Sequence, residues 1–74
     1  MTNLKFTAIY KKADEGGYVG YVIELPGANT QGETLEETRE NLKEAVSLLL
    51  ECYREEAENL PDSATKEDLI LQAA

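Results

Sequence analysis

The chain has 74 residues, with 7 basic and 15 acidic side chains and a formal net charge of -8. This length allows one domain, and a domain this small buries only about 60% of the surface of its unfolded chain, so its core is expected to be thin. The negative charge argues against direct nucleic-acid binding, which needs clustered lysine and arginine, and favours a basic protein as partner.

Composition also narrows the ways in which so small a domain can be stabilised. The chain has one cysteine, Cys52, and no histidine, so it can form neither an internal disulfide nor a Cys/His zinc site. Self-association is then the remaining way to stabilise a domain of this size. No apolar run approaches the roughly 20 residues of a membrane span, and residues 1–5 do not resemble a signal peptide. We therefore expect a cytoplasmic protein without membrane contact.

Two strands joined by a hairpin are predicted in the first third of the chain. Apolar and polar residues alternate over residues 4–10, which is typical of a strand. The apolar side chains on one face of this strand are Leu4, Phe6, Ala8 and Tyr10. Residues 12–17 are polar and end in two glycines, which indicates a hairpin loop. Residues 18–25 are rich in aromatic and β-branched residues and form the second strand. Its bulkier apolar face comprises Val19, Tyr21, Ile23 and Leu25.

A third strand and a long helix follow the turn at Pro26 and Gly27. Residues 28–31 are predicted to return along the sheet as a short strand that ends at Gly32. Thr34 and Glu37 then form a capping box, in which the Thr34 hydroxyl accepts from the Glu37 N–H and the Glu37 carboxylate accepts from the Thr34 N–H. The helix is predicted to span residues 35–59, because Pro61 ends it.

The helix has one apolar stripe and a second group of apolar residues beside it. At about 100° per residue, the stripe that should face the sheet is formed by Leu35, Leu42, Val46, Leu49, Leu50, Tyr53 and Ala57. Ala45, Leu48 and Cys52 lie off this stripe. We predict that these three residues contact a second chain in a homo-oligomer, either a dimer or a tetramer.

The last segment of the chain allows two interpretations. Residues 62–66 have the composition of a loop, and residues 67–72 are predicted to form a final strand that rejoins the sheet. The alternative is a short helix capped at Ser63 or Thr65. The preferred fold class is a single α+β domain over residues 1–74, in the order β-β-β-α-β, with one long helix packed on an antiparallel sheet.

Catalytic machinery is not apparent in the sequence. Without histidine, Ser-His-Asp and Cys-His catalysis are excluded. Cys52 lies in mid-helix beside several glutamates, where a packed or interface thiol is the favoured interpretation. The predicted strands up to residue 31 hold a single carboxylate, Glu24, so they do not assemble the acids of a two-metal nuclease. The glycines form no phosphate-binding loop. We therefore predict no catalytic residues, no metal site and no cofactor.

Residues 14–37, with the sequence DEGGYVGYVIELPGANTQGETLEE, resemble HicB-like antitoxins. The resemblance lies in the Gly17-Tyr18 hairpin, the Leu25-Pro26-Gly27 turn, the Thr30-x-Gly32-x-Thr34 approach to the helix, and the acidic helix itself. It extends over residues 4–57. The chain is thus similar to a short, single-domain member of a type II toxin–antitoxin family.

This resemblance implies a degenerate RNase H-like fold and a role without catalysis. The implied partner is a small basic ribonuclease toxin (HicA-like), which the acidic domain would neutralise by forming a complex. Fuller family members carry a C-terminal DNA-binding segment, and we expect no direct nucleic-acid binding by this chain alone. The sequence does not assign the residues that would contact a toxin. The alternatives are a regulatory or structural oligomer without a toxin, and a residual metal-dependent nuclease.

Overall fold

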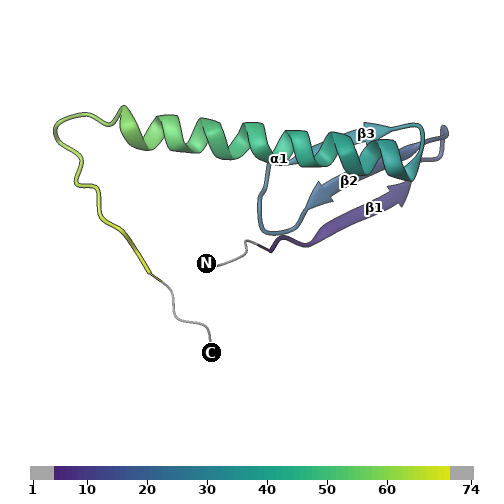
Figure 1. Ribbon diagram of the computed structural model, residues 1–74, viewed down its shortest axis with the longest axis horizontal. Helices are drawn as coiled ribbons and strands as arrows, with labels where there is room; N and C mark the ends of the chain where they lie inside the picture. The colour runs from purple at the N-terminus through teal and green to yellow at the C-terminus, as the bar shows by residue number, and fades with distance from the viewer. Residues whose placement is uncertain (1–4, 71–74) are drawn as a thin grey trace.

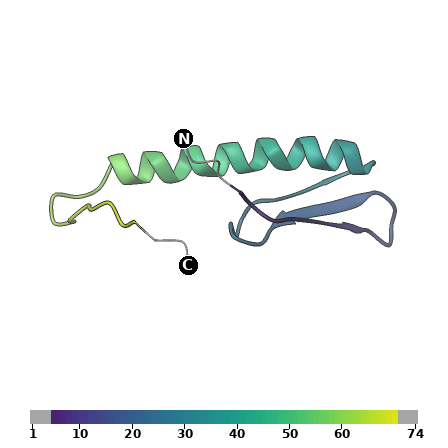
Figure 2. The same cartoon turned by 60° about the horizontal axis from the view of Figure 1, so that its bottom comes forward.

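Three strands and one helix make up the fold in the computed structural model, which describes residues 5–70. The elements are β1 (Ala8–Lys12), β2 (Tyr18–Val22), β3 (Asn29–Gly32) and α1 (Leu35–Glu58). The strands form one antiparallel sheet in the order β1-β2-β3, and α1 lies along one face of it (Figure 1). Figure 2 shows the two resulting layers, with the helix above the sheet. The predicted α+β class and the order of these four elements are confirmed.

Glycines set both turns of the sheet. Gly16 and Gly17 have φ of 100° and 77°, which lets the chain reverse while the Ala13 N–H donates to the Gly17 carbonyl at 3.0 Å. Between β2 and β3, Gly27 has φ of 102°. The hairpin loop and the second turn therefore form where the sequence predicts them.

The helix covers the sheet face that carries Gly20 and Val22 of β2. Gly20 and Val22 are buried on this face, whereas Val19, Tyr21 and Ile23 are 36 to 56% exposed on the other. The predicted alternation is thus correct, but the bulkier apolar set of the second strand lies mainly on the uncovered face. Its last member, Leu25, is buried because it follows the end of β2 and turns into the core.

Close approach between the first turns of α1 and the sheet explains why small residues face the helix. Thr38 is 0% exposed, and its hydroxyl donates to the Thr34 carbonyl at 2.8 Å. A Cβ atom on Gly32 would lie 2.6 Å from Thr38 Oγ1, and one on Gly20 would lie 3.1 Å from both Thr38 Cγ2 and Tyr10 Cδ1. The two glycines therefore provide the space that Thr38 fills. The apolar stripe predicted from the sequence does not include this threonine, because its side chain is polar.

The helix ends follow the predicted capping signals with one change. Thr34 is the N-cap, and its hydroxyl accepts from the Glu37 N–H at 3.0 Å. The Glu37 carboxylate, however, accepts from the Glu33 N–H at 3.4 Å rather than from Thr34. At the other end Asn59 is the C-cap, which confirms the predicted extent of the helix.

The core is thin and occupies only the middle of the helix. Its buried apolar residues are Val22, Leu25, Ala28 and Leu42, and the half-buried residues packed on them are Tyr10, Val46, Leu49 and Leu50. The predicted stripe is therefore correct in its centre. Leu35 is 37% and Tyr53 44% exposed. The 24 residues of α1 extend about 36 Å, whereas a five-residue strand extends about 17 Å. The helix is therefore longer than the sheet and projects beyond it.

The predicted final strand is not formed over residues 67–70, and neither is the alternative helix. Residues 71 and 72, the rest of that prediction, lie outside the described residues. Residues 60–70 are exposed throughout, with Leu69 and Ile70 at 83% and 84%. The physical reason is visible in Figure 1, where α1 carries the chain past the end of the sheet before it turns back. The segment thus leaves the helix away from any strand with which it could pair.

Candidate binding surfaces

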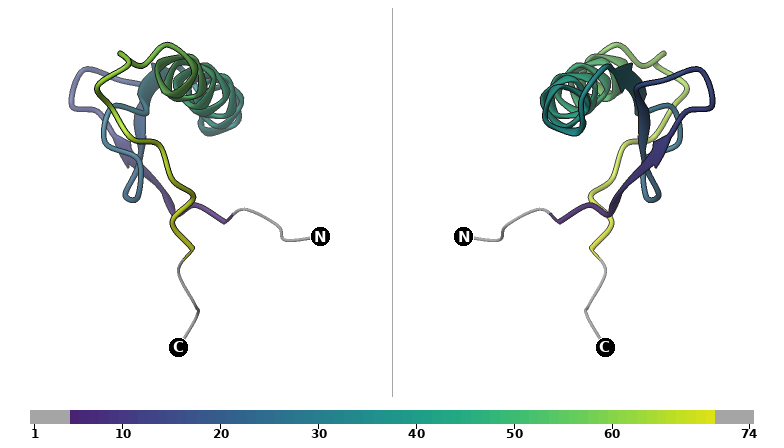
Figure 3. Two further views of the ribbon diagram at one scale, coloured as in Figure 1. Left: turned by 90° about the vertical axis from the view of Figure 1, so that its left-hand side faces the viewer. Right: turned by 90° about the vertical axis from the view of Figure 1, so that its right-hand side faces the viewer.

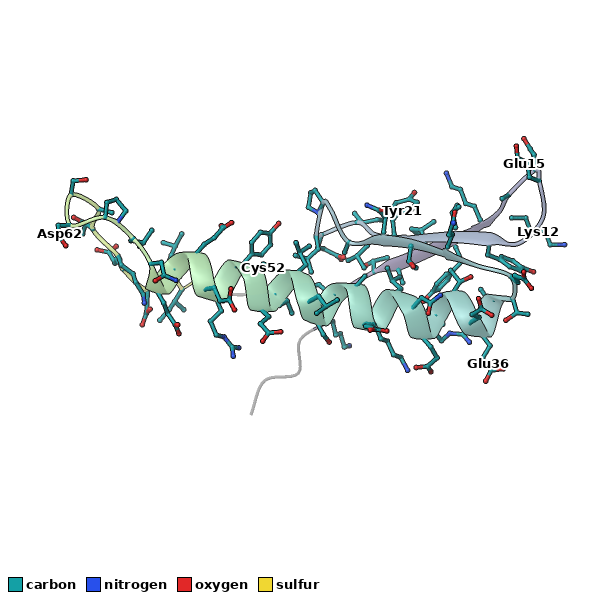
Figure 4. The ribbon with its side chains drawn as sticks, turned by 90° about the horizontal axis from the view of Figure 1, so that it is seen from above. Lys12, Glu15, Tyr21, Glu36, Cys52 and Asp62 are labelled. Carbon is teal, nitrogen blue, oxygen red and sulfur yellow. The ribbon has the colours of Figure 1, made fainter. Side chains whose placement is uncertain are left out.

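The side of α1 that faces away from the sheet is acidic. At 100° per residue, seven glutamates fall within an arc of about 100° on this side. They are Glu36, Glu37, Glu40, Glu44, Glu51, Glu55 and Glu58, all of them exposed, and we call them the acidic stripe. Figure 4 shows Glu36 projecting from α1 away from the sheet. The Lys43 ammonium pairs with Glu40 at 3.4 Å, so it neutralises only one member.

The three predicted oligomer contacts lie together on one flank of α1. Asn41, whose side-chain amide donates to the Gln31 carbonyl of β3 at 3.0 Å, shows that this flank faces β3. The same line along the helix continues with Ala45, Leu48 and Cys52. Ala45 is half-buried, Leu48 is 57% exposed and Cys52 is exposed. Figure 4 places Cys52 beyond the end of the sheet. The structure thus gathers these residues into one uncovered line, and their contact with a second chain stays a prediction.

A groove lies on the opposite flank, between α1 and β1. Viewed end on, α1 covers one face of the sheet (Figure 3), where it packs on β3 and β2. The inner face of β1 is left as one wall of the groove. The strand side is lined by Phe6, Ala8 and Tyr10, and the helix side by Arg39, Leu42, Lys43 and Val46. The Arg39 guanidinium lies 5.8 Å from the centre of the Tyr10 ring. We call this feature the β1 groove.

The β1 groove was not predicted from the sequence. The alternation in residues 4–10 indicates an apolar strand face, but it does not show that the helix leaves this face partly uncovered. That outcome depends on the position at which α1 docks. The only available signal is the pair Arg39 and Lys43, two of the three basic residues of a mainly acidic helix.

Glu24, the carboxylate considered for a nuclease site, is held by Thr7. Its two oxygens accept from the Thr7 N–H and the Thr7 hydroxyl, each at 2.6 Å. Hydrogen bonds from the Thr7 hydroxyl and then from its N–H lower the pKa of the Glu24 carboxyl below its usual value. The Ile23 N–H also donates to the Thr7 carbonyl at 3.0 Å. Glu24 therefore clamps the end of the β1–β2 hairpin, and no cluster of three metal-ligating side chains occurs within residues 5–70.

Replacing Glu24 with glutamine should reduce the dependence of stability on acidic pH. Because the folded state lowers the pKa of this carboxyl from 4.5, the clamp stabilises the fold above that pH. This stabilisation is lost as the pH falls through the lower, folded-state pKa. In urea unfolding, the difference between the wild type and the Glu24→Gln variant should be greatest at neutral pH and should shrink in acid. Glu15→Gln at the hairpin tip is the control, and an equal, pH-independent effect of both would contradict the clamp.

Comparison with known proteins identifies relatives over most of the chain. A family model described as UPF0150-like matches residues 6–57. A UPF0150 protein of Synechocystis is 38% identical over 68 residues, which cover 90% of this chain and 94% of the relative. A UPF0150 protein of Thermoplasma acidophilum is 38% identical over 64 residues, covering 86% and 93% of the two chains.

A more distant relative bears a functional name. The antitoxin HicB of Escherichia coli K12 is 34% identical over 58 residues. The alignment covers 78% of this chain but 42% of that antitoxin.

In the part of the chain that the structure describes, no helix is long and apolar enough to cross a membrane. Residues 6–57, which the family model matches, contain the whole sheet, both turns and nearly all of α1. The chain therefore belongs to the UPF0150-like family and is related to the HicB antitoxins.

Proposed function

We propose that the protein is an antitoxin-type binding domain that neutralises a small basic ribonuclease toxin by forming a complex with it. The observation that carries this proposal is the acidic stripe, a row of exposed glutamates along one rigid helix. The relationship to antitoxin HicB supports the choice of a toxin as partner. In this role the domain acts in the cytoplasm, without catalysis, metal or cofactor.

The stripe suits a partner that must itself bind RNA. A ribonuclease holds its substrate by lysine and arginine side chains placed against phosphates. A row of carboxylates presents the same sign of charge as RNA, so it attracts the toxin at long range and competes for the same basic side chains. From Glu36 to Glu58 the stripe extends about 33 Å, so one helix can cover a long basic surface. Inhibition then follows from occlusion of the RNA site.

The binding partner can be tested with matched charge reversals. The probe is a small basic protein whose gene adjoins this one, and its binding is measured by calorimetry and by inhibition of RNA cleavage. Lysine at Glu44, Glu51 and Glu55 together should weaken binding about 100-fold. Lysine at Asp14, Glu15 and Asp62, exposed loop residues that give the same change in charge, should weaken it less than about tenfold. Equal losses, or no binding of the wild type at micromolar concentration, would refute the proposal.

We further propose that the protein works as a homo-oligomer, a dimer or a tetramer. Its radius of gyration is 15.8 Å, whereas a compact chain of this length has about 11 Å. Its accessible surface is 6654 Å², and a monomer of this mass exposes about 4500 Å². The excess of about 2100 Å² is more than the roughly 800 Å² that each partner buries in a standard interface. The same excess of accessible surface supports the alternative function, a regulatory oligomer without a toxin.

Replacing Leu48 with glutamate should dissociate this oligomer if the β3-facing flank of α1 is its interface. The side chain is 57% exposed in the single chain, so the change should leave the fold intact while placing a charge in the contact. Sedimentation at micromolar concentration should show a smaller assembly than that of the wild type. The control is Ser63→Glu, which adds the same charge at an exposed site in the loop after α1. A wild type that sediments as a monomer would refute the oligomer, and an unchanged Leu48→Glu oligomer would refute this interface.

A further inference from the structure

The two edges of the sheet differ in what covers them. On β3, the Gln31 carbonyl accepts from the side-chain amide of Asn41 at 3.0 Å, so α1 covers part of that edge. On β1, the ladder to β2 uses the odd-numbered residues, as shown by the bonds from Ile23 N–H to the Thr7 carbonyl and from Ala13 N–H to the Gly17 carbonyl. In an antiparallel pair the alternate residues then direct their backbone groups outward. The N–H and C=O groups of Ala8, Tyr10 and Lys12 therefore form a free edge that no other strand within residues 5–70 pairs with.

This free edge adjoins the β1 groove, which is apolar inside and basic at its rim. Three of the seven basic residues of the chain lie on its side of the sheet. Lys12 ends β1 on the same face as Ala8 and Tyr10, and Arg39 and Lys43 line the groove from α1. Lys11 lies on the opposite face of β1, over the Tyr21 ring. A free strand edge beside an apolar groove binds an extended segment by backbone hydrogen bonds, with alternate side chains filling the groove. The basic rim selects a segment that also carries carboxylates.

Among the residues that the structure describes, one exposed segment combines carboxylates with apolar side chains in this way. Residues 67–70 are Glu67, Asp68, Leu69 and Ile70, two carboxylates followed by two apolar side chains. Leu69 and Ile70 are the most exposed large apolar residues that the structure describes, at 83% and 84%. Residues 67–70 have no helix or strand structure in the single copy. The segment and the free edge are thus complementary features of the same molecule.

We propose that residues 67–70 of a second copy bind along the free edge of β1 as an added strand. Successive side chains of the added strand point to opposite faces, so one of Leu69 and Ile70 enters the β1 groove together with the carboxylate two residues before it. The other apolar residue and the other carboxylate lie on the outer face, where Lys11 is placed over Tyr21. We assign the donor to a second copy because residues 67–70 form no strand on the edge of their own sheet. Residues 51–58 of α1, about 12 Å of helix, also project beyond the core and so carry the start of the segment toward a neighbouring molecule. Reciprocal exchange between two copies closes a two-fold dimer and leaves no free β1 edge. This contact lies on the flank of α1 opposite Leu48 and does not depend on a toxin.

Zero-length crosslinking between lysines and carboxylates tests the exchange directly. Unlabelled and 15N-labelled chains are unfolded together, refolded and treated with a carbodiimide. Mass spectrometry should find Lys11 or Lys12 joined to Glu67 or Asp68, with mixed-label pairs making up about half of these crosslinks. Crosslinks that are all single-label would show that each segment binds its own sheet, and absence of these crosslinks would show that the segment does not bind there. Either result would overturn the proposal.

A pair of charge-reversed variants provides a second test. One chain carries Glu67→Lys and Asp68→Lys, and the other carries Lys11→Glu and Lys12→Glu. All four sites are exposed, so both chains should fold. At low ionic strength each variant alone should dimerise at least tenfold more weakly than the wild type, and an equimolar mixture should recover dimers, because both exchanged contacts are again between opposite charges. A mixture no stronger than its components would refute the exchange. The double change Leu69→Ser and Ile70→Ser should also weaken the dimer, whereas Leu60→Ser outside the segment should not.

Discussion

Replacing Leu42 with alanine should destabilise the protein by about 3 kcal/mol. Leu42 is 3% exposed and is the one helix residue among the four buried apolar residues of the core. Truncation removes its contacts with Val22, Leu25 and Ala28 and leaves a cavity that these few neighbours cannot fill. A domain of this size has a free energy of unfolding near the lower end of about 5 to 15 kcal/mol. The loss is therefore a large fraction of the total.

Urea unfolding followed by circular dichroism measures this effect, and Leu48→Ala is the matched control. Leu48 is the same residue type on the same helix, but it is 57% exposed. In dilute protein its truncation should cost less than about 1 kcal/mol. A cost of Leu48→Ala that rises with protein concentration would report its place in an oligomer. Equal costs for the two variants in dilute solution would contradict the described core.

Replacing Gly32 with alanine should cost about 2 to 3 kcal/mol, although it adds only one methyl group. The new Cβ would lie 2.6 Å from Thr38 Oγ1, 2.9 Å from the Thr38 nitrogen and 3.1 Å from its Cα. Two of these three atoms belong to the backbone, so the clash cannot be relieved by rotating a side chain. The first turns of α1 must instead move away from β3.

The control for this substitution is Gln31→Ala, one residue earlier on the same strand. Gln31 is exposed, and its alanine variant keeps the backbone carbonyl that accepts from Asn41. It should change stability by less than about 0.5 kcal/mol. Adding Thr38→Ala to Gly32→Ala should not restore wild-type stability, because the contacts with the Thr38 backbone remain. A tolerated Gly32→Ala would show that the helix does not approach the sheet as closely as described.

The long helix separates three surfaces that the proposals assign to different contacts. One side packs on β2 and β3, the side away from the sheet carries the acidic stripe, and the flank with Leu48 is uncovered. The β1 groove adds a basic surface to a chain with a net charge of -8. A basic partner would therefore be directed to the stripe and repelled from the groove. Binding of a toxin and exchange of residues 67–70 can consequently be tested independently.

Features governed by neighbouring residues were predictable from the sequence. The hairpin glycines Gly16 and Gly17 and the helix start after Thr34 follow from backbone conformation and from a hydrogen bond across three residues. The helix end before Pro61 follows in the same way. The resemblance to the HicB family could also be found, because several of these local signals occur in the same order within residues 14–37. Each of these features depends on a few residues that are close in the chain.

Only the tertiary structure decided which surfaces are covered. Periodicity showed two faces on β2, but the close approach of Thr38 to Gly20 and Gly32 placed the helix over the face that carries Gly20 and Val22. The predicted strand at residues 67–72 has the composition of a strand, yet residues 67–70 form none in one copy. A strand forms only where its backbone pairs with a free edge, and in the single copy residues 67–70 pair with none. Sequence alone therefore determined the elements, whereas distances between elements far apart in the chain determined the core, the β1 groove and the unpartnered segment.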